Sequence, residues 1–140
     1  MKTYCDSSFD NKRGIAGIGI VIDDGFKRRT FALFTKARTN NEAELFAIHL
    51  ASILNEGKGT IYTDSMNAIQ MINDRVKDKP RTREQYLNYM YCKYWAVQIK
   101  KRGIKVEKIQ AHSTQFKTHL MGNNLADCLA KEGRSKFYER

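Results

Sequence analysis

Residues 58–65 have the sequence KGTIYTDS. Thr60 to Thr63 is a run of β-branched and aromatic residues that follows a glycine, which predicts a short strand. Ser65 can cap a helix that begins immediately afterwards. Asp64 is therefore expected at the carboxyl end of the strand, where open α/β sheets place their binding and catalytic groups. Three further acids are candidate partners: Asp6, Glu44 and Asp127.

Three strands and a helix are expected before this stretch. Residues 2–8 alternate weakly, which puts Asp6 in the last turn of a first strand. Residues 15–22 and 27–36 are typical of two antiparallel strands joined by a tight turn. Thr39 and Glu42 fit the capping box of a helix over residues 43–54. Within that helix Glu44 shares a face with apolar residues, so its carboxylate should point toward the sheet.

After the central strand, helices are expected over residues 65–76 and 83–102, and a fifth strand over residues 104–109. The aromatic residues of the long helix are expected mainly to pack in the core: Tyr86, Tyr89, Tyr94 and Trp95. Residues 111–122 are expected to form a polar loop that contains His112 and His119. Asn123 and Asn124 should cap a last helix over residues 124–133, with Asp127 in its first turn.

This order of elements predicts an α/β fold with a mixed five-stranded sheet, three antiparallel strands then two parallel ones, flanked by helices. Residues 1–140 are expected to form a single domain, with residues 134–140 as a basic tail that frays. The formal charge of +10 over 140 residues favours an anionic partner, nucleic acid first.

The cysteines and the apolar pattern limit the setting of the protein. Cys5, Cys92 and Cys128 are odd in number and widely spaced, which excludes a zinc or redox motif and indicates reduced core thiols. The chain shows neither a signal region nor a membrane span. We therefore expect a soluble, cytoplasmic monomer in a reducing compartment, without membrane association and without a small-molecule cofactor.

Each of the four acids has an ordinary structural explanation, as a turn former, a strand end or a helix charge. Their placement at one sheet edge, however, would make four carboxylates repel by several kcal/mol unless cations neutralised them. Oxygen ligands without properly spaced Cys or His favour Mg²⁺ or Mn²⁺ over Zn²⁺. In a basic protein, such a pocket suits phosphodiester cleavage assisted by two metal ions.

Four short motifs carry a family resemblance that covers residues 2–133. Residues 4–8, 39–45, 62–65 and 123–127 are YCDSS, TNNEAEL, YTDS and NNLAD. In this order and at this approximate spacing they resemble the acidic motifs of ribonuclease H type 1. The chain departs from the family at Ser7, where a Gly is common, and a positive φ there would cost about 1 kcal/mol.

The resemblance implies hydrolysis of the RNA strand of an RNA–DNA hybrid, leaving 5′-phosphate and 3′-hydroxyl ends. Asp6, Glu44, Asp64 and Asp127 would be the ligands of two Mg²⁺ ions, with Mn²⁺ as a substitute. Asn40 and Asn41 match positions that contact the hybrid in its minor groove, and Thr39 would lie near a DNA phosphate. Ser65, Asn123, Lys79 and Arg81 are also expected to contact the substrate.

His112 is similar to the histidine of the family's mobile loop, which is thought to assist proton transfer or product release. The loop that follows is longer here, so His119 is an alternative. Two other functions stay open: a catalytically silent module that binds a hybrid or duplex, and a metal-dependent DNA nuclease of the same fold. The four intact acids argue against the first. The pair Asn40 and Asn41, together with Asp127 at the expected start of the last helix, argues against the second.

Overall fold

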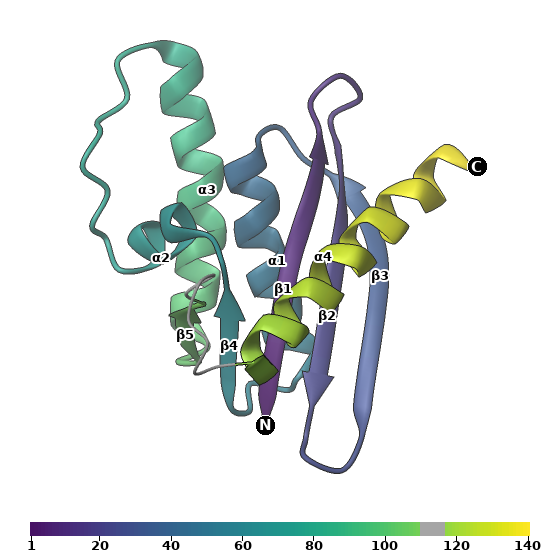
Figure 1. Cartoon of the computed structure of the whole chain (residues 1–140). Helices are drawn as coiled ribbons and strands as arrows, with labels where there is room; N and C mark the ends of the chain where they lie inside the picture. Colours follow the sequence, from purple (N-terminus) through teal and green to yellow (C-terminus); the bar gives the residue numbers. More distant parts are fainter. Residues whose placement is uncertain (110–116) are drawn as a thin grey trace.

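The computed structural model describes residues 1–109 and 117–140, and within these residues a mixed five-stranded sheet runs through the molecule (Figure 1). Strands β1 (Lys2–Asp10), β2 (Ile15–Asp23) and β3 (Arg28–Lys36) form an antiparallel meander. Strand β4 (Thr60–Thr63) pairs in parallel with β1, and β5 (Lys105–Lys108) pairs in parallel with β4. The strand order is β3-β2-β1-β4-β5. The predicted fold class is confirmed.

Helices cover both faces of the sheet. Helix α1 (Asn40–Leu54) packs on β1, β2 and α3 (Arg83–Lys101), and α2 (Met66–Ile72) packs against α1 and α3. Helix α4 (Lys117–Tyr138) crosses β1, β2 and β3 on the opposite face (Figure 1). Ile18, Ile20, Leu45, Ile48 and Ile99 belong to the larger core cluster. A smaller cluster under α4 includes Tyr4, Val21, Ile109 and Ala126.

Glycines in β2 let the backbone of α4 approach the sheet. A Cβ added at Gly19 would lie 2.0 Å from the carbonyl oxygen of Ala126, and one at Gly17 would lie 1.8 Å from that of Ala130. No side chain fits in such a gap, because backbone atoms of a packed helix cannot yield independently. The absent side chains therefore fix how close α4, which carries Asp127, comes to the sheet.

The start of α1 is capped as predicted, but Glu42 has a different partner. The Thr39 hydroxyl accepts the Glu42 N–H at 3.1 Å. The Glu42 carboxylate does not close the capping box. It accepts the backbone N–H of Arg38 at 2.9 Å and the indole N–H of Trp95 at 3.2 Å. Glu42 therefore ties the first turn of α1 to α3.

Two predicted boundaries near the sheet were wrong. Strand β1 continues to Asp10, so Asp6 lies inside the strand rather than in its last turn. The reason is that β2 pairs with β1 along its whole length, whereas β4 pairs only with residues 2–4. Helix α2 ends at Ile72 instead of residue 76, and Asp74 adopts a left-handed backbone with φ of 54°, which cannot continue a helix.

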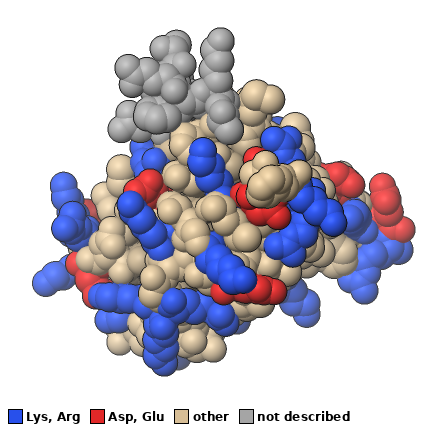
Figure 2. Space-filling view, turned by 90° about the horizontal axis from the view of Figure 1, so that it is seen from below, with Lys and Arg blue, Asp and Glu red and all other residues tan. Residues whose placement is uncertain are grey.

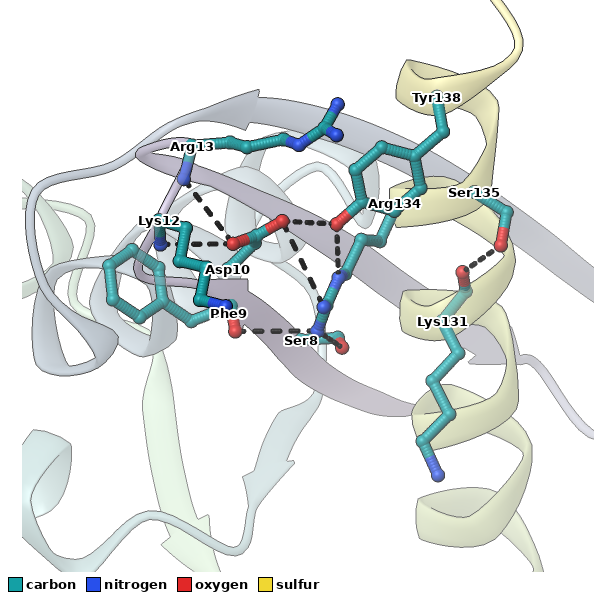
Figure 3. Close-up of polar contacts among 9 residues, drawn as sticks. All are labelled: Ser8, Phe9, Asp10, Lys12, Arg13, Lys131, Arg134, Ser135 and Tyr138. Atoms are coloured by element: carbon teal, nitrogen blue, oxygen red, sulfur yellow. Dashed lines mark hydrogen bonds and ion pairs between the residues drawn. The ribbon is translucent and has the colours of Figure 1, made fainter.

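Helix α4 begins earlier and ends later than predicted. Because it starts at Lys117, Asn123 does not cap it, Asp127 is not in its first turn, and His119 is helical. The tail that was expected to fray is helical to Tyr138. Figure 3 shows its anchor: the Arg134 guanidinium reaches β1, and the Tyr138 hydroxyl donates a hydrogen bond to the Asp10 carboxylate. These polar partners hold the end of the helix.

Two predictions about burial were also wrong. The side chains of Tyr86 and Tyr94 are 55% and 56% exposed, so they do not pack in the core. Trp95 does pack against the core cluster. Cys5 and Cys92 are buried thiols as expected, but Cys128 is exposed on α4.

The surface carries the positive charge that the composition requires. In the view of Figure 2, Lys and Arg side chains are spread across the face, with smaller groups of Asp and Glu between them. Among residues 1–109 and 117–140, every helix is too short or too polar to cross a bilayer.

Candidate metal centre and substrate groove

Three acids from separate elements converge beside β1. Asp6 lies within β1, Asp64 directly follows β4, and Glu44 lies near the start of α1. One carboxylate oxygen of each lies within 4.8 Å of the other two. Asp6 and Glu44 are buried, with 6% and 8% of their surface exposed, whereas Asp64 is exposed. The group therefore has a dry inner side and a side open to solvent.

Burial and mutual repulsion make two of these carboxylates hard to ionise. Burial, with the charges of Glu44 and Asp64, raises the pKa of Asp6 to about 8, although the backbone N–H of Ser7 donates to Asp6 Oδ1 at 2.9 Å and opposes the rise. Burial likewise raises the pKa of Glu44 to about 7, and the nearby Ser7 side chain partly offsets the rise, although the Ser7 hydroxyl makes no hydrogen bond among the described residues. A bound cation would relieve both effects.

Asp127 stands at the margin of this group. It is not one of the three acids whose oxygens lie within 4.8 Å of one another. Its carboxyl is nevertheless close enough for a side-chain hydrogen bond that raises the pKa of Asp6 further, and its charge raises the pKa of Glu44. Asp127 forms an ion pair with Lys131, with Nζ 3.1 Å from Oδ2. The motifs did not single out Lys131, although its four-residue spacing from Asp127 on a helix predicts this pair.

The chemistry of the ligand set fits a hard divalent ion. All three convergent side chains offer carboxylate oxygens, the ligands that Mg²⁺ and Mn²⁺ prefer. Cys5 is the nearby soft ligand, but burial, and next the charge of Glu44, raise the pKa of its thiol well above the ordinary value. A thiol kept protonated is a poor ligand for Zn²⁺. The residues present therefore fit a magnesium or manganese site better than a zinc site.

A groove of about 560 Å³ lies between α1, α2, α3 and the segment that joins the last two. It brings together three of the predicted substrate residues, Thr39, Asn41 and Lys79. Asn67, which the sequence did not single out, also lines it and donates to the Asn41 side chain at 3.3 Å. Arg81 lines an adjoining hollow together with Lys77 and Lys79. Asn40 is exposed at the first residue of α1 and does not line the groove.

The other predicted substrate residues flank the acids along the chain. Ser65 caps α2 by accepting the Ala68 N–H at 3.1 Å. Asn123 lies within α4 before Asp127, and its buried Oδ1 has no hydrogen-bond partner among the described residues. Ser7 is part of β1 and does not adopt a positive φ, so the strain expected at this departure from the family pattern does not arise.

Of the two candidate histidines, only His119 lies within the described residues. His112 lies outside the described residues. The Nδ1 atom of His119 is 2.8 Å from the Tyr4 hydroxyl, and its ring centroid is 4.4 Å from that of Tyr62. His119, in the first turn of α4, therefore packs with the aromatic side chains of Tyr4 and Tyr62 and does not belong to the group of three acids.

Comparison with known proteins points to one family. A sequence model of RNase H matches residues 1–135. The search of curated proteins gave no match. RNase H1 from the halophilic archaeon Halobacterium salinarum NRC-1 has a similar structure, with a TM-score of 0.65 at 16% identity over 96% of this chain and 97% of that one.

Two foamy virus structures are similar as well. Prototype foamy virus protease-reverse transcriptase gives a TM-score of 0.58 at 23% identity over 94% of this chain, which spans 20% of the viral chain. The foamy viral protease-reverse transcriptase in complex with dsDNA gives 0.62 at 21% identity, over 94% of this chain and 92% of that one. At these identities the likeness concerns the fold.

Proposed function

This chain belongs to the RNase H family, and from that premise we propose that it hydrolyses the RNA strand of RNA–DNA hybrids, leaving 5′-phosphate and 3′-hydroxyl ends. The observation that supports the proposal most directly is the group formed by Asp6, Glu44 and Asp64, whose oxygens lie within 4.8 Å of one another. Carboxylates this close together need cations to neutralise their repulsion. The net charge of +10 on the whole protein would attract an anionic substrate to its surface.

In this proposal Asp6, Glu44, Asp64 and Asp127 hold two Mg²⁺ ions. When bound, such ions supply activation of a water molecule and stabilisation of the leaving 3′ oxygen. The chain contributes the geometry: β1 and β4 fix Asp6 and Asp64, and the capped start of α1 fixes Glu44. His112 is proposed to assist proton transfer or product release, as its similarity to the histidine of the family's mobile loop suggests.

The groove would hold the hybrid beside the acids. Thr39 and Lys79 line it, and Arg81 lies in the adjoining hollow, so these residues are placed to contact backbone phosphates. Asn40 and Asn41 are the first two residues of α1, about one helical turn before Glu44. They would contact the 2′-hydroxyls of the RNA strand in the minor groove. Ser65 and Asn123 would contact the strand on either side of the acids.

A side-by-side cleavage assay tests the proposal. Labelled RNA–DNA hybrid, dsRNA and dsDNA are incubated with the full chain, with Mg²⁺, with Mn²⁺, or with EDTA. We expect cleavage of the RNA strand of the hybrid alone, dependent on the metal, with ends that a 5′-phosphate-specific exonuclease accepts. Binding of the hybrid without cleavage would instead indicate a silent binding module. Equal cleavage of dsDNA would indicate a DNA nuclease.

A further inference from the structure

Ser7 has a buried hydroxyl without a partner beside the acid group. The residue is 9% exposed, and its Oγ atom makes no hydrogen bond among the described residues. A buried hydroxyl that bonds to nothing lowers the stability of a fold, so its presence calls for an explanation. Ser7 is also the position at which the chain departs from the glycine that is common in the family, and a glycine would carry no hydroxyl.

The backbone and the side chain of Ser7 reach different acids. Its backbone N–H donates to Asp6 Oδ1 at 2.9 Å. Its side chain shares a face of the sheet with that of Ile18, because the two residues lie directly opposite each other on antiparallel strands. Ile18 belongs to the core cluster that also contains Ile48 of α1. The Ser7 side chain therefore points to the face covered by α1, the helix that carries Glu44.

Asp6 points to the other face of the sheet. It lies opposite Gly19, where an added Cβ would be 2.0 Å from the carbonyl oxygen of Ala126 in α4. The hydroxyl of Ser7 is thus turned away from Asp6 and toward Glu44. Burial raises the pKa of Glu44, and the Ser7 side chain is near enough to lower it in part. The unused donor and the Glu44 carboxylate are therefore neighbours.

We propose that Ser7 is a positioning residue for Glu44: its hydroxyl donates a hydrogen bond to the Glu44 carboxylate when that acid binds a divalent ion. A serine hydroxyl can reach a neighbouring acceptor by rotation about its own side-chain bonds. A hydrogen bond to a charged carboxylate is stronger than one to a neutral group, and a bond of this kind orients a metal ligand. The inference rests on the metal-dependent function proposed above.

A serine with a purely structural role would behave differently, and Ser52 of α1 offers the comparison. Ser52 is fully buried, and its hydroxyl donates to the carbonyl oxygen of His49 at 2.6 Å. Ser52→Ala removes a hydrogen bond that the fold already makes, so it should destabilise the metal-free protein. Ser7→Ala removes a buried polar group that has no partner, so it should not destabilise the metal-free protein.

Metal affinity and stability are measured on the full chain without substrate. Mn²⁺ is titrated into the metal-free protein by calorimetry at one fixed pH, and urea unfolding is followed in EDTA. Ser7→Ala should weaken Mn²⁺ binding by about tenfold and leave the free energy of unfolding in EDTA unchanged or higher. Ser7→Thr keeps the hydroxyl and should bind Mn²⁺ as the wild type does. Ser52→Ala should show the opposite pattern, with lower stability and unchanged Mn²⁺ affinity.

Three results would each overturn the inference. They are an unchanged Mn²⁺ affinity in Ser7→Ala, a loss of stability of this variant in EDTA, and an equally weakened affinity in Ser7→Thr, which would make the shape of the side chain responsible instead of its donor. Wild-type protein that binds Mn²⁺ no more tightly than Ser7→Ala would defeat this inference alone. Wild-type protein that binds no Mn²⁺ would defeat the nuclease proposal as well.

Discussion

Asp6 in β1 and Asp64, the residue that directly follows β4, occupy equivalent positions along two neighbouring parallel segments. The register pairs Tyr4 of β1 with Tyr62 of β4, and each acid follows its tyrosine by two residues. β4 ends at Thr63 while β1 continues to Asp10, so the edge of β1 beside Asp6 has no strand partner on that side. Glu44 enters this opening from α1. The early end of β4 therefore creates the space in which the carboxylates meet.

The first prediction concerns Asp64→Asn, which removes one metal-binding oxygen with little change of shape. Mutation of a residue that only supports a metal ligand typically lowers metal affinity or activity by roughly 10- to 100-fold. Loss of a ligand itself should therefore reduce the rate of hybrid cleavage by at least about 100-fold. The measurement is the initial rate with saturating Mg²⁺. Asp74→Asn is the control, because Asp74 is exposed and Asn tolerates its left-handed backbone. Unchanged activity in Asp64→Asn would remove this acid from the site.

The second prediction concerns the stability of the metal-free protein. The pKa of Asp6 is raised from 3.8 to about 8 in the folded state, so the folded chain binds this proton more tightly than the unfolded chain does. The stabilisation is complete below about pH 4 and is lost as the pH rises through about 8. The raised pKa of Glu44 acts in the same direction. In EDTA the free energy of unfolding should therefore fall between these pH values.

Asp6→Asn checks the origin of this pH dependence. At pH 8 in EDTA the variant should be more stable than the wild type by about 2 kcal/mol, because a buried charge is removed from among like charges. Urea unfolding at several pH values measures the difference. Mg²⁺ should stabilise the wild type at pH 8 and the variant much less. A wild-type stability that stays level over this range would contradict the crowding of the carboxylates.

The third prediction concerns Lys79, which lines the groove. If Lys79 contacts a phosphate, Lys79→Gln should weaken hybrid binding and reduce the slope of log affinity against log salt by about one. Fluorescence anisotropy in the inactive Asp64→Asn background measures the slope without cleavage. Lys27→Gln serves as the control for a general loss of positive charge. Equal slopes for the two variants would place the phosphate contacts elsewhere on the surface.

The fourth prediction concerns the contact between β2 and α4. Gly19→Ala would place a methyl group 2.0 Å from the carbonyl oxygen of Ala126 and 2.5 Å from the N atom of Ala130. Backbone atoms must move, so we expect a loss of about 2 to 3 kcal/mol in the free energy of unfolding. Gly25→Ala meets open space and should cost only about 1 kcal/mol for its positive φ. Similar losses in the two variants would mean that α4 is not held this closely.

Local signals were enough for several elements of the fold. The stretch KGTIYTDS gave β4 with its observed bounds, because β-branched residues favour a strand and the residues on either side interrupt it. Thr39 marked the start of α1, since a hydroxyl that accepts a backbone N–H is a property of neighbouring residues alone. The inward direction of Glu44 also followed from helical spacing, and its burial confirms it.

Contacts between distant segments decided the rest. Helix α4 extends beyond its predicted ends because its C-terminal turn bonds to Asp10 and its glycines and alanines pack closely on the sheet. Tyr86 and Tyr94 share the aromatic character of Trp95, yet only Trp95 packs against the core, and spacing alone did not separate them.

The sequence by itself determined which acids this protein has, which elements carry them and which sheet edge they approach. Only the tertiary structure decided that Asp6, Glu44 and Asp64 form a close group while Asp127 pairs with Lys131. The reason is that composition and spacing act over a few residues of chain. The distance between two carboxylates on different elements depends on strand register and helix packing, which every layer of the fold sets together.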